Sequence, residues 1–257
     1  MSADGVNLKD MDLTEAVTYI KGPESTAVLL TVKRGEDVFP VGVLRKRFAL
    51  PTVEYSTISQ VGYVKVWSFG AQTDVEFDGA VSQMEEKGMG LVIDLRGNGG
   101  GYLHTAVNMA ASFVGNRPAV IAWNKNDGFI PLAGIPSRMI VMPAIILTDG
   151  YTASASEIFS AALRDYGIAA IIGETTFGKG SIQSLFELSN GDVLKLTTHY
   201  FYTPAGKPIN GVGLEPDLNL RDEHLLNAAV LLLAGDAEEK ESKKGFVAVK
   251  VGDRITG

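Results

Sequence analysis

Apolar segments that fit buried strands alternate with helical segments along most of this chain, and this alternation limits the fold more than any other feature. Continuous apolar runs at 90–95, 138–148 and 168–174 are separated by helical patterns at 102–115 and 153–167. A strand that is apolar on both sides is typical of a parallel sheet buried on both faces, whose strands are usually connected by helices. This part of the chain is therefore predicted to form an α/β layer structure.

Further elements extend this prediction. Clean strand alternation occurs at 62–69, a helical pattern at 76–88 and a final apolar helix at 224–235, and two strands flank the turn Asn190-Gly191. Strands and turns of this kind fit the edges of the same layer structure.

The amino-terminal region has a different character. Asp12 is suited to cap a helix at 13–20, with Glu15 three residues later, and strands are expected at 27–34 and 39–47. Pro51 closes this region. We therefore expect a small β-rich domain at the amino-terminal end.

Charge and composition exclude several kinds of protein. The formal net charge is −7, so a nucleic-acid backbone would be repelled, and no nucleic-acid partner is expected. The chain has no cysteine, which excludes disulfides, thiolate catalysis and cysteine-bound metals. No run reaches the roughly 18 apolar residues of a membrane span, and the first ten residues have no apolar signal core, so no stable membrane insertion is expected.

The segment GETTFGKGS at 173–181 is similar to a phosphate-binding loop but fails as one. Gly180 replaces the hydroxyl residue after Lys179, and the residues from Ser181 onward fit a strand rather than the required helix. A lysine between two glycines and close to Phe177 could instead sit in a close-packed niche, where lost hydration disfavours the charged ammonium. Such a lysine can act as a general base.

Two strand-to-helix turns offer partners for this base. Ser154 and Ser156 begin the helix after 138–148, where free amide groups favour developing negative charge. The glycine-rich loop at 94–102 also joins a strand to a helix, and its glycines allow amides to approach a reacting oxygen. Each feature alone is more often a helix cap or a tight turn.

Histidine and metal chemistry are not favoured. The chain has three histidines, which lie in the predicted elements at positions 104, 199 and 224 without an acidic partner nearby. Without cysteine, these scattered histidines do not form a zinc-site pattern. We expect no metal and no cofactor.

Taken together, these segments resemble the C-terminal processing proteases, also called tail-specific proteases. The motifs GYVKVWSFG, GLVIDLRGNGGGYL, TDGYTASASEIFSAALRDYG, IIGETTFGKGSIQ and FYTPAGKPINGVGLEPDL follow one another in the order of that family. The resemblance implies an α/β fold with a ClpP/crotonase-like protease core and a small PDZ-like β-rich domain. It also implies a serine endopeptidase that cleaves protein substrates near their carboxyl termini.

The resemblance assigns roles to particular residues. Ser154 would be the nucleophile, Lys179 the general base and Gln183 the residue that orients the lysine. The oxyanion hole would use the amide of Ala155 and one amide of the glycine loop, from Gly99 or Gly100. Ser156 is expected to support the helix start, and Glu157 to be a first-turn anion favoured by the helix dipole.

The resemblance also predicts a domain plan. Residues 1–50 are similar to the middle of a PDZ domain, and 245–257 to the element that should precede it. We therefore expect the two to complete one domain, by circular permutation or by an engineered rearrangement. Residues 51–235 would be the protease core and 236–244 a charged linker. The implied partners are protein or peptide substrates with apolar carboxyl termini. The implied site of action is extracytoplasmic, in a periplasm, a cell envelope or a thylakoid lumen.

Two other functions remain open from the sequence. The first is a catalytically idle peptide-binding module that retains the protease fold. The second is an acyl-CoA enzyme of the crotonase type, since that superfamily also builds its sites from amides at strand-helix junctions.

Overall fold

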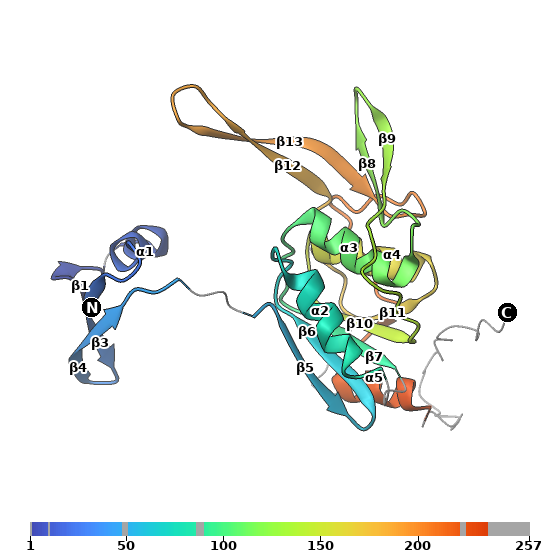
Figure 1. Cartoon of the computed structure of the whole chain (residues 1–257), viewed down its shortest axis with the longest axis horizontal. Coiled ribbons are helices and arrows are strands. Elements are labelled where there is room, and N and C mark those ends of the chain that lie inside the picture. Colours follow the sequence, from blue (N-terminus) through green and yellow to red (C-terminus); the bar gives the residue numbers. More distant parts are fainter. Residues whose placement is uncertain (1, 10, 48–50, 86–89, 222–224, 236–257) are drawn as a thin grey trace. The chain divides into compact units, whose positions relative to one another are not determined.

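The computed structural model describes residues 2–9, 11–47, 51–85, 90–221 and 225–235 (Figure 1). The chain divides into two compact units, Met1–Leu50 and Pro51–Gly257. The predicted linker and the predicted PDZ-like strand after it, 236–257, lie outside the described residues.

The first unit is a four-stranded antiparallel sheet with one helix. Its sheet order is β2-β1-β3-β4. The elements are β1 (Ser2–Ala3), β2 (Val6–Asn7), α1 (Leu13–Ile20), β3 (Ala27–Arg34) and β4 (Asp37–Leu44). The predicted capping of α1 is confirmed, because the Asp12 side chain accepts a hydrogen bond of 2.9 Å from the Glu15 amide.

One arginine ties this helix to the sheet. The guanidinium of Arg45 donates to the carbonyl of Ile20 at 2.8 Å and to that of Ala27 at 3.0 Å. Carbonyls in the last turn of a helix lack partners within the helix, so this contact satisfies one of them. The side chain therefore joins the end of α1 to the start of β3.

The second unit is built on a six-stranded sheet in the order β14-β11-β10-β7-β6-β5. All neighbours are parallel except β5 and β6, which are antiparallel. The strands are β5 (Val53–Ile58), β6 (Val61–Val66), β7 (Leu91–Asp94), β10 (Ala144–Thr148), β11 (Ala169–Gly173) and β14 (Leu218–Asn219). The predicted largely parallel sheet is confirmed.

Helices cover both faces of this sheet (Figure 1). One face packs against α2 (Thr73–Ser82), α3 (Leu103–Val114) and α4 (Ala155–Asp165), and the other against α5 (Leu225–Ala234). Phe77, Phe113 and Phe159, one from each of the first three helices, meet with ring centroids 6.1 to 6.2 Å apart. The central strands are apolar on both sides because both sides are buried.

A second sheet of the same unit has the order β12-β13-β8-β9. It consists of two hairpins, which project from the core in Figure 1. The hairpins are β8 (Val120–Asn124) with β9 (Gly128–Leu132), and β12 (Ser181–Glu187) with β13 (Val193–Tyr202). The sequence predicts the β12–β13 pair, whereas β5 and the β8–β9 hairpin were not anticipated.

One predicted strand is too long. Of the residues 138–148, only Ala144–Thr148 form a strand. Pro143 lacks the amide that an interior strand needs, so the strand begins after it. Among the described residues, no helix has the length and apolar character needed to cross a membrane.

Candidate active site

Ser154 lies at the turn between β10 and α4, directly before the first residue of the helix. Its backbone has φ 60° and ψ −117°, a conformation that side chains other than glycine rarely adopt. The amide of Ser154 donates a hydrogen bond of 2.7 Å to the Glu157 carboxylate. This contact holds the serine, which is half-buried, in a strained turn.

Lys179 comes from the loop after β11, and its backbone meets the same turn. Its amide donates to Glu157 Oε2 at 2.9 Å, the same oxygen that binds the Ser154 amide. A second contact joins the two segments, because the Phe177 amide donates to the Thr152 carbonyl at 2.9 Å. The fold therefore brings together the main chains of the two predicted reacting residues.

Glu157 is the centre of this arrangement. Its side chain is fully buried, and its other oxygen, Oε1, accepts from Thr176 Oγ1 at 2.6 Å and from the Gly178 amide at 2.8 Å. A buried carboxylate is costly unless hydrogen bonds compensate, and four donors do so here. The sequence placed Glu157 only in the first helical turn, because its partners in the lysine loop cannot be seen from the local pattern.

The side chains are arranged differently from the expectation. Lys179 is exposed, not enclosed in a dry niche. Among the described residues, no hydrogen bond joins Ser154 Oγ to Lys179 Nζ. Gln183, on β12, is also exposed, and no hydrogen bond joins it to Lys179 within the same ranges.

The glycines beside Lys179 explain this difference. A Cβ at Gly178 would lie 2.9 Å from the Gly213 amide, and a Cβ at Gly180 would lie 2.3 Å from that of Asn210. Both glycines are therefore needed so that the lysine loop can pack against the 209–213 segment. They do not supply side chains that would bury the lysine.

The glycine-rich loop after β7 packs directly against Ser154, the predicted nucleophile. A Cβ at Gly100 would lie 2.7 Å from the Ala153 carbonyl and 2.8 Å from Ser154 Cβ. The Gly100 amide already donates to Asn98 Oδ1 at 2.9 Å. The amides of Gly99 and Ala155, in contrast, have no hydrogen-bond acceptor within the part of the chain that the structure describes.

Asn98 connects the glycine loop to the serine turn. Its side chain is buried and donates to the Val66 carbonyl at 2.8 Å. Its own carbonyl accepts from the Ala153 amide and from Ser156 Oγ, both at 3.0 Å. Ser156 thus supports the helix start, as the sequence predicts. The two turns form one hydrogen-bonded structure.

A cluster of charges missed by the sequence analysis lies at the base of the glycine loop. The buried Asp94 carboxylate accepts from Lys65 Nζ at 3.2 Å, from the Tyr63 hydroxyl at 2.9 Å and from Arg96 Nε at 3.0 Å. Burial opposes ionisation of Asp94, but the Arg96 and Lys65 cations outweigh it and hold the pKa of that carboxyl below its usual range. Burial, with the nearby Asp94 charge, raises the pKa of the Tyr63 hydroxyl to about 12. The cluster fixes the chain where the loop begins.

The two histidines that the structure describes make their contacts with residues other than Ser154 and Lys179. His199 contacts Asn124 through Nε2 at 2.7 Å, and His104 stacks near Tyr102 with ring centroids 5.3 Å apart. Neither forms a hydrogen bond to Ser154 among the described residues, and His224 lies outside them. The described residues also contain no group of three or more His, Cys, Asp or Glu side chains suited to hold a metal ion.

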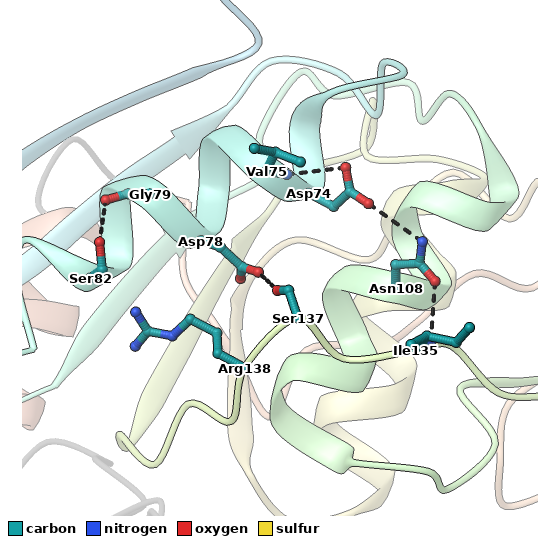
Figure 2. Close-up of a pocket in the computed structure, with 9 residues that line it drawn as sticks. All are labelled: Asp74, Val75, Asp78, Gly79, Ser82, Asn108, Ile135, Ser137 and Arg138. Carbon is teal, nitrogen blue, oxygen red and sulfur yellow. Dashed lines mark hydrogen bonds between the residues drawn. The ribbon is translucent and has the colours of Figure 1, made fainter.

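Two hollows in the second unit are lined by residues outside the serine turn and the lysine loop. One, of about 460 Å³, is lined by the charge cluster around Asp94. The other, of about 390 Å³, lies between α2, α3 and the 135–138 segment, with Asp74, Asp78 and Asn108 on its wall (Figure 2). Neither hollow is lined by Ser154 or Lys179.

A family of known peptidases matches the part of the chain that contains the serine turn, the lysine loop and the glycine loop. Residues 60–220 match peptidase family S41. That segment is more than half of the 257 residues. The chain belongs to peptidase family S41. Its mixed α/β fold with several sheets is accordingly the fold of an S41 peptidase.

Relatives within the S41 family support this placement. The chain is 32% identical over 253 residues to a probable CtpA-like serine protease of Staphylococcus aureus, covering 97% of this chain and 51% of the relative. It is 33% identical over 225 residues to a carboxy-terminal-processing protease of Bartonella bacilliformis, covering 84% of this chain and 52% of the relative. The chain thus spans about half the length of these relatives.

A solved structure agrees with the S41 assignment. The photosystem II D1 C-terminal processing protease is 28% identical, with a TM-score of 0.64. The match covers 92% of this chain and 67% of the other. Both units of the present chain fall largely within this similarity.

Proposed function

We propose that this S41 chain is a serine endopeptidase that cleaves polypeptides near their carboxyl termini through a Ser154–Lys179 dyad. One observation carries the proposal: a single buried oxygen of Glu157 binds the backbone amides of both residues. This oxygen fixes the two backbones relative to each other, although the residues are 25 positions apart in the sequence. The names of the relatives, which include carboxy-terminal-processing proteases, support the substrate class.

The proposed mechanism is acyl transfer. Ser154 Oγ attacks the scissile carbonyl while the neutral Lys179 amine takes the hydroxyl proton. The C–N bond then breaks, Lys179 returns the proton to the leaving amine, and water hydrolyses the ester left on the serine. Gln183 would orient the lysine.

The oxyanion hole is proposed to use the amides of Ala155 and Gly99. Both amides lack an acceptor in the described part of the chain, whereas the Gly100 amide is engaged by Asn98. Ala155 is the first residue of α4, where a free amide and the helix dipole both favour an anion.

The Lys179 side chain must move for this chemistry to proceed. A general base needs to lie about 2.6 to 3.2 Å from the proton donor, and catalytic contacts often tighten only when substrate binds. We propose that a bound polypeptide displaces water from Lys179 and turns its amine toward Ser154.

We further propose that the first unit is PDZ-like and binds apolar carboxyl-terminal ends of substrates, with α1 forming one wall of the groove. The predicted completion of this unit by 245–257 remains a prediction. An extracytoplasmic site of action is proposed on the same resemblance to C-terminal processing proteases.

A second candidate function is a peptide-binding module whose catalytic centre is idle. The exposed Lys179 side chain, without a hydrogen bond to Ser154 in the described structure, is the observation that favours it. The two functions differ in a single measurement, the cleavage of an unstructured substrate.

That measurement is incubation of the purified chain with an unstructured polypeptide that ends in apolar residues. We expect cleavage, and we expect Ser154→Ala and Lys179→Ala to lower kcat by about 10⁴-fold or more. Ser82→Ala and Lys195→Ala are the matched controls, because Ser82 is exposed at the end of α2 and Lys195 is exposed on β13. Cleavage that survives Ser154→Ala or Lys179→Ala would disprove the dyad, and no cleavage by the unmodified chain would favour the idle module.

A further inference from the structure

Strand β12 lies at the edge of its sheet and begins two residues after Lys179. It pairs with β13 on one side, and no described strand pairs with its other side. The strand is seven residues long and runs away from Lys179 along the projecting hairpin (Figure 1). An open strand edge therefore starts at the candidate active site.

The residues that face the open side follow from the ladder. The carbonyl of Gly180 accepts a hydrogen bond from β13, and the amide of Leu188 donates across the turn of the same hairpin. Backbone groups of successive strand residues point to opposite sides, so the even-numbered residues face β13. The bulge at Ile182 adds its extra residue to β13 and leaves this alternation in β12 unchanged. The residues with backbone groups on the open side are Ser181, Gln183, Leu185 and Glu187.

The open edge carries two large exposed apolar side chains. Leu185 is 67% exposed and Phe186 is 45% exposed. Natural edge strands are commonly protected by charged side chains, especially lysine, by proline, by bulges or by a covering element. Glu187 is the one charged residue of β12, the extra residue of the bulge belongs to β13, and β12 contains neither lysine nor proline. A weakly protected edge of this kind is a template for another extended chain.

We propose that the open edge of β12 binds the substrate as an added antiparallel strand formed by residues on the amino-terminal side of the scissile bond. This inference rests on the proposed endopeptidase function. Antiparallel pairing is slightly the more stable kind. Since β12 runs away from Lys179, an antiparallel partner runs toward it and delivers its next carbonyl to Ser154.

The geometry defines the class of substrate. Because β12 has seven residues, a substrate strand paired along its whole length would contact it with about seven residues upstream of the scissile bond. The segment must be unfolded and extended, and side chains at alternate positions would contact the apolar surface around Leu185. The bound strand would also cover the start of β12, where Lys179 and Gln183 are exposed, and so exclude water from the general base.

An N-methyl scan of a synthetic substrate tests this inference without changing the protein. Each peptide carries one methyl group on a different backbone nitrogen, which removes one hydrogen-bond donor. We expect affinity for the Ser154→Ala variant, measured by fluorescence anisotropy, to fall about 3- to 10-fold at every second position upstream of the cleavage site. Losses without alternation, or losses confined to the downstream side, would overturn the inference.

A substitution in β12 tests the protein side. Leu185→Pro removes one outward amide and keeps the ladder to β13, because proline is tolerated at an edge with its nitrogen facing solvent. Leu185→Ala is the matched control that keeps the amide. We expect the proline variant to bind the peptide about 3- to 10-fold more weakly than the alanine variant, with the same melting temperature. Equal affinities would contradict the inference.

Two further readouts separate the possible failures. Covalent labelling of Ser154 by a fluorophosphonate probe reports the reactive serine independently of β12, so a chain that is labelled but shows no alternation retains the proposed function and loses this inference. A chain that is not labelled but still shows the alternating binding pattern would retain this inference and lose the proposed endopeptidase function. A concentration-dependent dimer in sedimentation that Leu185→Pro abolishes, combined with a flat methyl scan, would assign the edge to a second copy of the chain.

Discussion

The turn between β10 and α4 and the β12–β13 hairpin are both connected to the candidate active site, yet they are held in very different ways. In the turn, Thr152 Oγ1 donates to the Leu95 carbonyl at 2.9 Å, and the Ala153 and Ser154 amides bind Asn98 and Glu157. The hairpin is held by the ladder between its own strands and by a short pairing of the end of β13 with β8, and most of its side chains are exposed. The difference indicates that the backbone of the proposed reacting residues is fixed in the absence of substrate, whereas β12 remains available for pairing.

A pair of large-to-small substitutions should separate the two regions most strongly. Ile146, fully buried in β10, should lose about 2–5 kcal/mol of unfolding free energy when changed to alanine. Leu185→Ala in β12 should change it by less than about 0.5 kcal/mol. Urea denaturation measures both values, and similar losses would show that Leu185 is covered in solution.

Glu157→Gln should test whether the turn depends on one carboxylate. In glutamine, one carboxylate oxygen is replaced by an NH₂ group that cannot accept a hydrogen bond. The two donors that bind that oxygen of Glu157 would lose their acceptor, and the free energy of unfolding should fall by about 1–3 kcal/mol. Misplacement of Ser154 relative to Lys179 should lower kcat by about 100-fold with little change in KM. Glu215→Gln, at an exposed position before β14, is the control. An unchanged kcat in Glu157→Gln would refute its positioning role.

Gly100→Ala should disturb the turn through contact alone. The residue has φ +99°, and an added Cβ would meet backbone atoms of Ala153 and Ala155 at 2.7 and 2.9 Å. We expect a cost of about 1–3 kcal/mol and a clear loss of cleavage, measured by thermal unfolding and by peptide hydrolysis. Gly79→Ala, in α2 and with open space around its Cβ position, should retain both properties. Equal effects at the two positions would mean that the loop does not pack as described.

Removing the Asp78 carboxylate should stabilise the protein slightly above pH 4, whereas removing that of Glu157 should destabilise it. This is the smallest of the predicted effects. It lies beside the hollow of Figure 2, where its Oδ2 accepts from Ser137 and its buried Oδ1 has no partner among the described residues. Burial raises the pKa of Asp78, so its contribution to stability is complete below the ordinary carboxyl pKa and is lost as pH rises through the folded-state value. Asp78→Asn should therefore flatten the fall in stability above pH 4, measured by thermal unfolding across a pH series. A steeper fall would contradict this assignment.

Much of the fold could be predicted because its elements follow local periodicity. The helices α1, α3 and α4, the strands β7 and β11 and the hairpin turn at Asn190-Gly191 all appear where the pattern places them. The β8–β9 hairpin was missed, because its short strands, VIAWN and GFIPL, show no alternation of polar and apolar residues in the sequence, although their burial alternates in the structure. The strand predicted at 138–148 could have been placed correctly after Pro143, because a proline in a strand interior is a local signal.

The candidate site was only partly predictable. Ser154 and the glycine loop follow from their positions after parallel strands, whose carboxyl ends share one edge of the sheet. The charge cluster around Asp94 was missed because its members come from β6 and from β7, which are adjacent only in the folded sheet. The exposure of Lys179 was predicted wrongly, since glycines on either side of a residue can serve close backbone packing as well as burial.

The sequence by itself determined the layered α/β architecture, the two strand-to-helix turns and the residues that could react, because each depends on neighbours along the chain. The tertiary structure alone decided that Glu157 holds both backbones. It also decided that, among the described residues, the Gly99 amide has no acceptor whereas the Gly100 amide has one, and that no described strand pairs with one edge of β12. Each of these depends on which distant backbone groups become neighbours. Hydrogen-bond partners and exposure are properties of the packed sheet, and no local pattern encodes them.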